Sequence, residues 1–342
     1  MNRLRALPLE LIVLAYCLVY LPNVMVLKLA TSGAHPVLGR PLTGLETLPA
    51  TLIINTVMTW AFIWWSGWYK HANRVALGGF SIPFPTRYTF LSGIGTALVL
   101  FTVPLSFTIE GVSIPFIQLL MRGDVLVIAP LVDFAFGRKV HWWSWVALFM
   151  VMGALLITLA DRGGLNLPPL AILTVVLYTI GYFLRLYAMN RVSKDGDAAM
   201  VRRYFVEEKI IALPIAIAVL GAISASGIGG QASELDWGFV TVWSDPVLIH
   251  LMVVAATLTI ISVLAILILL DPRENAYCVP LERAASLVAG IVASVLLAFF
   301  WDQKMPRTAE FIGAAILIAA IVLLSLAPRF SKPEPDKTAR ET

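Results

Sequence analysis

Two charged residues, Arg122 and Asp124, lie near the centre of one apolar stretch, residues 114–133. A charge at the middle of a membrane span costs a few kcal/mol on insertion scales, and such residues usually mark a solute or ion pathway. Arg122 could bind a carboxylate or phosphate group, and Asp124 could bind a cationic group or a coupling proton. Because helical residues two positions apart point to different sides, these two side chains would need separate partners.

A second acid–base pair, Glu282 and Arg283, lies in another apolar stretch, residues 276–301. Opposite charges could pair between the two stretches, for instance Arg122 with Glu282 or Asp124 with Arg283. Two interpretations stay open. The charges form buried ion pairs that only neutralise each other, or they line a polar cavity that binds an anionic or zwitterionic solute.

Neutral side chains could complete such a cavity. Gln118 lies four residues before Arg122, on the same face of the expected helix. Tyr178 and Tyr182 belong to a further apolar stretch and could add hydroxyl groups. Most tryptophans are expected at span ends, where aromatic residues mark the membrane interface. Trp60 is placed about two turns inside its span and is therefore the better pocket residue.

The composition identifies the kind of protein that carries these charges. The chain has 342 residues, of which 59% are hydrophobic and 13% charged, whereas soluble domains have about 45–50% apolar and about 25% charged residues. A bilayer core needs about 20 apolar residues per helix. By that measure the sequence predicts an all-α polytopic membrane protein with ten spans, at residues 9–29, 47–67, 89–109, 112–135, 143–160, 168–190, 204–224, 247–270, 276–301 and 306–327.

The distribution of Lys and Arg predicts the orientation of these spans. With ten spans both termini lie on one side, and most Lys and Arg of the connecting segments fall on that side. Positive charge concentrates in cytoplasmic segments, so we expect cytoplasmic N- and C-termini in a cell inner (plasma) membrane. The polar residues 330–342 are expected to form a disordered cytoplasmic tail.

The chain also contains a weak internal repeat. One fixed offset aligns Ser113-Ile114-Pro115-Phe116 with Cys278-Val279-Pro280-Leu281, and each segment opens an apolar span that a polar hairpin joins to another. Five spans per half is an odd number, so the second half would be inverted relative to the first, as in many secondary transporters. We therefore expect two five-helix repeats, residues 1–161 and 162–329.

Prolines within these spans are candidates for moving parts, because proline removes a backbone donor and kinks a helix. Pro115 and Pro280 occupy matching positions of the two repeats and could shape gates on opposite sides of the membrane. Pro130 is a third candidate hinge in the same span as Pro115. Ordinary kinking, which membrane helices tolerate, is the simpler interpretation.

Residues 112–161 resemble the end of an EamA-type repeat of the drug/metabolite transporter (DMT) superfamily. The resemblance rests on the proline-started span, the Ala129-Pro130 pair, the charged turn Gly137-Arg138-Lys139 and the small pair Gly153-Ala154. It implies two inverted five-helix repeats and a secondary active transporter that works by alternating access. The second repeat departs from the pattern, because Asp302-Gln303-Lys304 replaces the Gly-Arg-Lys turn.

The sequence leaves several functions open. The first is a transporter of a small organic solute, such as a metabolite, amino acid or drug-like compound, with proton coupling as one option. The alternative is a membrane enzyme acting on a lipid-linked or phosphate-bearing substrate, with Arg122, Asp124 and Glu282 at its site, and a third is a membrane scaffold. We expect no cofactor, resident metal or nucleic-acid partner, since no phosphate-binding or metal-ligand motif occurs. The solute, the direction of transport and the oligomeric state stay open.

Overall fold

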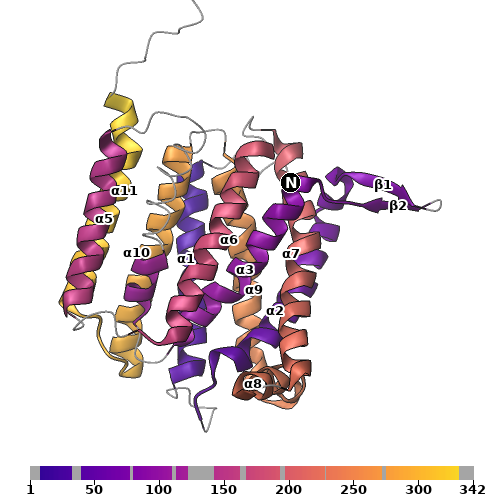
Figure 1. Ribbon diagram of the computed structural model, residues 1–342, viewed down its shortest axis with the longest axis horizontal. Coiled ribbons are helices and arrows are strands. Elements are labelled where there is room, and N and C mark those ends of the chain that lie inside the picture. Colours follow the sequence, from indigo (N-terminus) through magenta and orange to yellow (C-terminus); the bar gives the residue numbers. More distant parts are fainter. Residues whose placement is uncertain are drawn as a thin grey trace, which may run out of the picture.

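The computed structural model describes residues 8–32, 40–77, 80–109, 113–121, 142–161, 167–192, 197–227, 229–271 and 275–330. The long helices run side by side (Figure 1), and residues 114–121 form a further helical segment. The long helices are α1 (Leu9–Ser32), α2 (Gly44–Trp65), α3 (Arg87–Thr108), α5 (Trp142–Asp161), α6 (Pro169–Val192), α7 (Ala198–Ser226), α9 (Leu248–Leu269), α10 (Asn275–Trp301) and α11 (Thr308–Phe330).

Within the described residues, seven helices are long and apolar enough to cross a membrane: α1, α2, α3, α6, α7, α9 and α10. Shorter apolar helices occur at residues 145–161 of α5 and 308–323 of α11. The chain is therefore a multi-pass membrane protein built of α-helices, as its composition predicts. α11 continues to Phe330, so the expected tail lies outside the described residues except for that first position.

Side-chain caps explain where two of the helices begin. Thr43 and Glu46 form a capping box at the start of α2, and Arg40 binds Glu46 with both terminal nitrogens. The hydrogen bond to Glu46 raises the pKa of the Arg40 guanidinium. Asp197 caps α7, which therefore begins six residues earlier than the predicted span at 204–224. The sequence places Glu207 and Glu208 at the start of that span, where acidic residues favour a helix N-terminus. They lie well inside α7 instead, so this prediction is wrong.

Most helix pairs come from distant parts of the sequence. α3 packs on α6 and α7, whereas α1 packs on α9 and α10. α2 packs on α9 and α7, and α5 pairs with α11 at one side of the bundle (Figure 1). The α3–α6 crossing is close, because a Cβ on Gly95 or Gly181 would meet the backbone of the other helix. Small residues allow this approach in membrane proteins.

Two segments that lie between the predicted spans have regular secondary structure. Residues between α2 and α3 form the short helix η2 (Trp68–His71) and an antiparallel hairpin, β1 (Arg74–Leu77) with β2 (Phe80–Pro83). Between α7 and α9 lie α8 (Gly229–Phe239) and η3 (Thr241–Ser244). The hairpin and α8 lie at opposite ends of the bundle, and α11 ends at the hairpin end (Figure 1).

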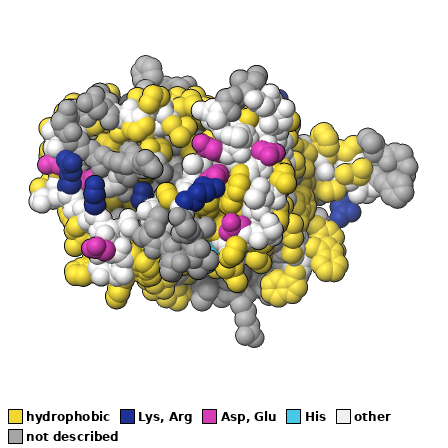
Figure 2. All heavy atoms as spheres, turned by 90° about the horizontal axis from the view of Figure 1, so that it is seen from below, with side chains coloured by type: hydrophobic (Ala, Val, Ile, Leu, Met, Phe, Trp, Pro, Cys, Tyr) yellow, Lys and Arg dark blue, Asp and Glu magenta, His cyan; other side chains and the backbone are white. Residues whose placement is uncertain are grey.

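The outside of the bundle is largely apolar. Large hydrophobic side chains such as Phe149, Leu156 and Phe299 are exposed on α5 and α10, and Figure 2 shows hydrophobic side chains around the rim of the α8 end. A lipid bilayer accounts for this exposure. Trp64 and Trp65 are exposed at the end of α2 as expected of interface residues, whereas the prediction is wrong for the buried Trp68, which packs on Phe62 and Phe205.

Candidate functional site

An acid–base pair on α10 is the centre of the candidate site. Glu282 and Arg283 are 5% and 3% exposed, and the Arg283 Nε atom lies 3.2 Å from Glu282 Oε2. Two neighbours in sequence therefore pair with each other in the interior of the bundle. The cross-helix partners expected from the sequence, Arg122 and Asp124, lie outside the described residues.

Tyrosines from two other helices surround this pair. The Tyr16 hydroxyl of α1 donates a hydrogen bond of 2.5 Å to Glu282 Oε1, and Arg283 Nη1 donates one of 2.5 Å to the Tyr178 hydroxyl of α6. The Arg283 guanidinium carbon also lies 3.7 Å from the centre of the Tyr182 ring, a cation–π contact. We call Glu282, Arg283, Tyr16, Tyr178 and Tyr182 the α10 site.

The two tyrosines of α6 lie on one face of the helix and contact the same guanidinium group. Tyr178 and Tyr182 are four residues apart, so they lie on one face of the helix, and their rings stack with centroids 5.8 Å apart and planes 20° from parallel. This places a hydroxyl and an aromatic face against the same guanidinium. The structure thus brings together Tyr178, Tyr182 and Arg283, three of the residues selected from the sequence.

Gln118 lies against the same face of α10, two turns further along. Its side-chain amide lies across Gly290, where even a Cβ would collide with it, and Gly290 is seven residues from Arg283, on the same helical face. Gln118 is 1% exposed, and neither of its amide atoms has a hydrogen-bond partner among the described residues. The same holds for the hydroxyls of Tyr182 and Ser294.

These unsatisfied groups have a physical consequence. A buried donor or acceptor without a partner costs about 1–3 kcal/mol, so native interiors rarely leave such groups unmatched. Three of them are contributed by α6, α10 and the segment 114–121, the helical elements around the pair. The arrangement can therefore supply hydrogen bonds to a polar molecule beside a carboxylate and a guanidinium.

The remaining residues selected from the sequence have different surroundings. Trp60 is half-buried in α2 and packs against the hydrophobic cluster that also contains Tyr16, Tyr178 and Tyr182. Pro130 lies outside the described residues. Pro115 is the second residue of the helical segment 114–121, where a missing N–H breaks no helical bond, whereas Pro280 is the sixth residue of α10. The two matched prolines thus differ in helical position.

A second buried charged cluster joins α3, α6 and α7. Arg185 Nε lies 2.9 Å from Glu208 Oε1, and the same oxygen accepts hydrogen bonds from Thr96 at 2.5 Å and Ser92 at 3.0 Å. The sequence favours Arg185 and Lys209 reaching out to the membrane surface. Instead both are buried, and Lys209 lies over the Phe205 ring at 5.5 Å. Because the helices also cross closely at Gly95 and Gly181, we interpret this cluster as a packing contact.

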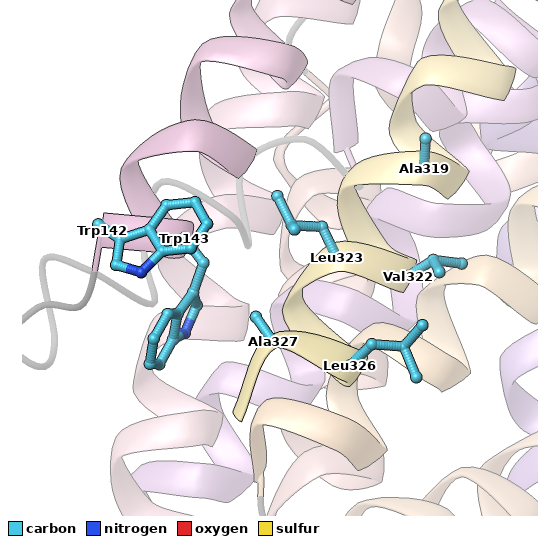
Figure 3. Close-up of a pocket in the computed structure, with 7 residues that line it drawn as sticks. All are labelled: Trp142, Trp143, Ala319, Val322, Leu323, Leu326 and Ala327. Carbon is cyan, nitrogen blue, oxygen red and sulfur yellow. The ribbon is translucent and has the colours of Figure 1, made fainter. Parts of the chain in front are cut away.

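An open apolar pocket lies between α5 and α11 (Figure 3). Trp142 and Trp143 of α5 lie opposite α11, with Leu323 and Ala327 on the side of that helix nearest to them. The indole nitrogens are the only polar side-chain atoms of its lining, so the pocket suits a hydrocarbon chain better than a polar solute. Its other lining residues are Ala319, Val322, Leu323, Leu326 and Ala327.

Comparison with known proteins adds little to these observations. No protein-family model matches the chain, and no curated protein matches it. One solved structure, described only as "Crystal structure of protein", is similar at 16% sequence identity with a TM-score of 0.47, covering 95% of this chain and 99% of that one. That description names no activity, so the function must be argued from the geometry of the chain itself.

Proposed function

We propose that the protein is a secondary transporter that moves a small zwitterionic organic solute across a membrane by alternating access. One observation carries the proposal: a carboxylate and a guanidinium are buried side by side in membrane helix α10, in contact with α1 and α6. Ionisable groups inside a membrane bundle mark solute or ion pathways, and unsatisfied hydrogen-bonding groups lie along the same face of α10.

The charge of the site favours a zwitterion. Glu282 and Arg283 together carry no net charge, and a zwitterion adds none. Its carboxylate would take the place of Glu282 beside Arg283, while its ammonium group would bind Glu282. A singly charged solute would leave one charge uncompensated, and an unpaired buried charge costs several kcal/mol. The amide of Gln118, which has no partner among the described residues, would bind the polar part of the solute.

The packing of the helices supports two inverted five-helix repeats. If α1, α2 and α3 correspond to α6, α7 and α9, then the α1–α9 and α2–α9 pairs correspond to α6–α3 and α7–α3, and all four pairs occur. Polar contacts follow the same exchange. Asn55 of α2 binds Thr259 of α9, and Glu208 of α7 binds Thr96 of α3. We therefore propose ten spans. Nine of them are the long helices, and the other, between α3 and α5, includes residues 114–121.

The charges at the two ends of the bundle support the orientation with cytoplasmic termini. Lys70, Arg74 and Arg87 are exposed at the hairpin end, where α11 also ends. Acidic residues such as Glu234 and Asp236 belong to α8 at the other end. By the positive-inside rule the hairpin end is cytoplasmic, which matches the distribution of Lys and Arg along the whole sequence.

Transport in proteoliposomes tests the proposal. Vesicles with the purified protein receive an equimolar mixture of neutral amino acids, dicarboxylates, sugar phosphates and choline, with and without a pH gradient, and mass spectrometry measures the internal solutes. We expect zwitterions to accumulate chemically unchanged above empty vesicles, and Arg283→Gln to abolish this while the exposed-site control Lys304→Gln does not. No accumulation, or accumulation unaffected by Arg283→Gln, would contradict the proposal. Chemical conversion of a solute by the protein in detergent would favour the alternative that it is a membrane enzyme.

A further inference from the structure

The hairpin between α2 and α3 has two unlike faces. In its register Val75 lies opposite Ile82, and Ala76 lies opposite Ser81. Paired residues project to the same face, and successive residues alternate. Val75 and Ile82 therefore share one face, on which both are exposed, at 40% and 48%. Arg74, Ala76 and Ser81 belong to the other face. Burying this pair of aliphatic side chains in an apolar environment would be favourable, so this face is a candidate contact surface.

A buried carboxylate fixes the base of the hairpin to the bundle. Glu207 of α7 accepts hydrogen bonds from the backbone N–H groups of Asn73 at 3.0 Å and Thr86 at 3.2 Å, which flank the two strands. It also binds Thr89 at 2.7 Å and Arg203 at 2.8 Å. Both ends of the hairpin are thus fixed to α7.

The position of the hairpin matches the membrane interface. It follows α2 and precedes α3, both membrane-crossing by length and composition, and it extends sideways from the bundle rather than along its axis (Figure 1). Exposed Trp64 and Trp65 end α2 just before it, and tryptophans prefer the headgroup level. Phe84, after β2, adds a further exposed aromatic ring.

The positive charge around the hairpin favours contact with anionic lipids. Lys70, Arg74 and Arg87 are exposed around the hairpin, and no acidic residue occurs in the sequence between Glu46 and Glu110. Hydrophobic and basic side chains are visible together on the projecting hairpin (Figure 2). Each basic residue near an anionic membrane surface contributes roughly a fivefold gain in binding.

We propose that the β1–β2 hairpin is a membrane-surface anchor that inserts Val75 and Ile82 among lipid chains and binds anionic lipid headgroups through Lys70, Arg74 and Arg87. The anchor extends the footprint of the protein on one leaflet beyond its helices. This inference does not depend on the transport proposal.

Site-directed spin labels test the insertion. Cysteines at Val75 or Ile82, and at Ala76 or Ser81 as matched controls, are introduced into a Cys17→Ala/Cys278→Ala background and reconstituted in nanodiscs of phosphatidylcholine with phosphatidylglycerol. We expect labels at Val75 and Ile82 to be accessible to oxygen and shielded from a water-soluble nickel complex, and the controls to show the reverse. Equal access of nickel to all four labels, or shielding of Val75 and Ile82 from both reagents as in a protein contact, would overturn the proposal.

Lipid retention tests the headgroup preference with the natural cysteines in place. Native mass spectrometry compares phosphatidylglycerol with phosphatidylcholine bound to the wild type, to Arg74→Gln and to Lys304→Gln, which removes an exposed charge far from the hairpin. We expect Arg74→Gln to lower the ratio of the two lipids roughly fivefold and Lys304→Gln to leave it unchanged. The same ratio in all three proteins would refute the assignment of anionic lipid.

Discussion

Neutralising Glu208 is expected to weaken the contact between α3, α6 and α7 strongly. Glu208→Gln keeps an oxygen that can accept hydrogen bonds from Ser92 and Thr96, but it removes the charge that faces Arg185 at 2.9 Å. Arg185 is buried, with 9% of its side chain exposed, so water cannot compensate it. Breaking one partner of a buried pair costs about 3–5 kcal/mol.

A surface pair provides the matched control. Arg307 and Asp161 are 3.2 Å apart, but their side chains are 56% and 42% exposed. Exposed pairs contribute about 0–1 kcal/mol because water and salt screen them. Asp161→Asn should therefore reduce the free energy of unfolding by less than about 1 kcal/mol, although the separation of its charges differs little from that of the buried pair.

Reversible unfolding in mixed detergent micelles measures both variants, the single variant Arg185→Met and the double variant Arg185→Met/Glu208→Gln. We expect the double variant to lose less stability than the sum of its single changes, because neither charge is then left alone. If Glu208→Gln destabilises the protein no more than Asp161→Asn does, the buried pair does not hold these helices together, and the interpretation as a packing contact fails.

Three further predictions concern the α10 site and the hairpin. Gly290→Ala should displace the Gln118 amide and reduce solute affinity in a binding titration at least tenfold, whereas Ala289→Gly should have little effect; equal affinity in both would exclude Gln118 from the site. Tyr178→Phe removes the hydroxyl bound to Arg283 and should weaken solute binding by roughly tenfold, the value of one charged hydrogen bond; unchanged binding would show that the ring alone matters. Glu207→Gln should speed hydrogen exchange at Asn73 and Thr86, measured by mass spectrometry, and unchanged exchange would mean that Glu207 does not hold the hairpin.

The sequence predicts the helices well because hydropathy and helix length are local properties. The described long helices all fall at expected spans, and the start of α7 differs only because the Asp197 cap adds polar turns before the apolar part. The hairpin is not among the predicted elements although its signal is present: two short apolar runs separated by Gly78-Gly79 are typical of a β-hairpin. A search for apolar stretches of about 20 residues does not detect such a short segment.

The partners of the charged residues could not be predicted, because they depend on packing between distant segments. Nothing in the sequence around Tyr16 indicates that its hydroxyl reaches Glu282, which is separated from it by most of the chain. Likewise, the position of Arg185 near the end of its span favours contact with the membrane surface, but Glu208 on the next helix holds it inside. Hydropathy records the cost of a charge and contains no information about its partner.

The two buried charge clusters show why burial alone does not identify a solute site. Both contain one carboxylate and one guanidinium, and both are inaccessible to water in this state. The contacts of Glu208 converge on one oxygen from three helices that meet at glycines, so a solute could enter only by separating them. Arg283 pairs with its neighbour Glu282 and contacts two tyrosine rings of α6, and the amide of Gln118 on the same face of α10 has no partner among the described residues. A solute could satisfy that amide, which is why we propose binding at α10 and structural support at α7.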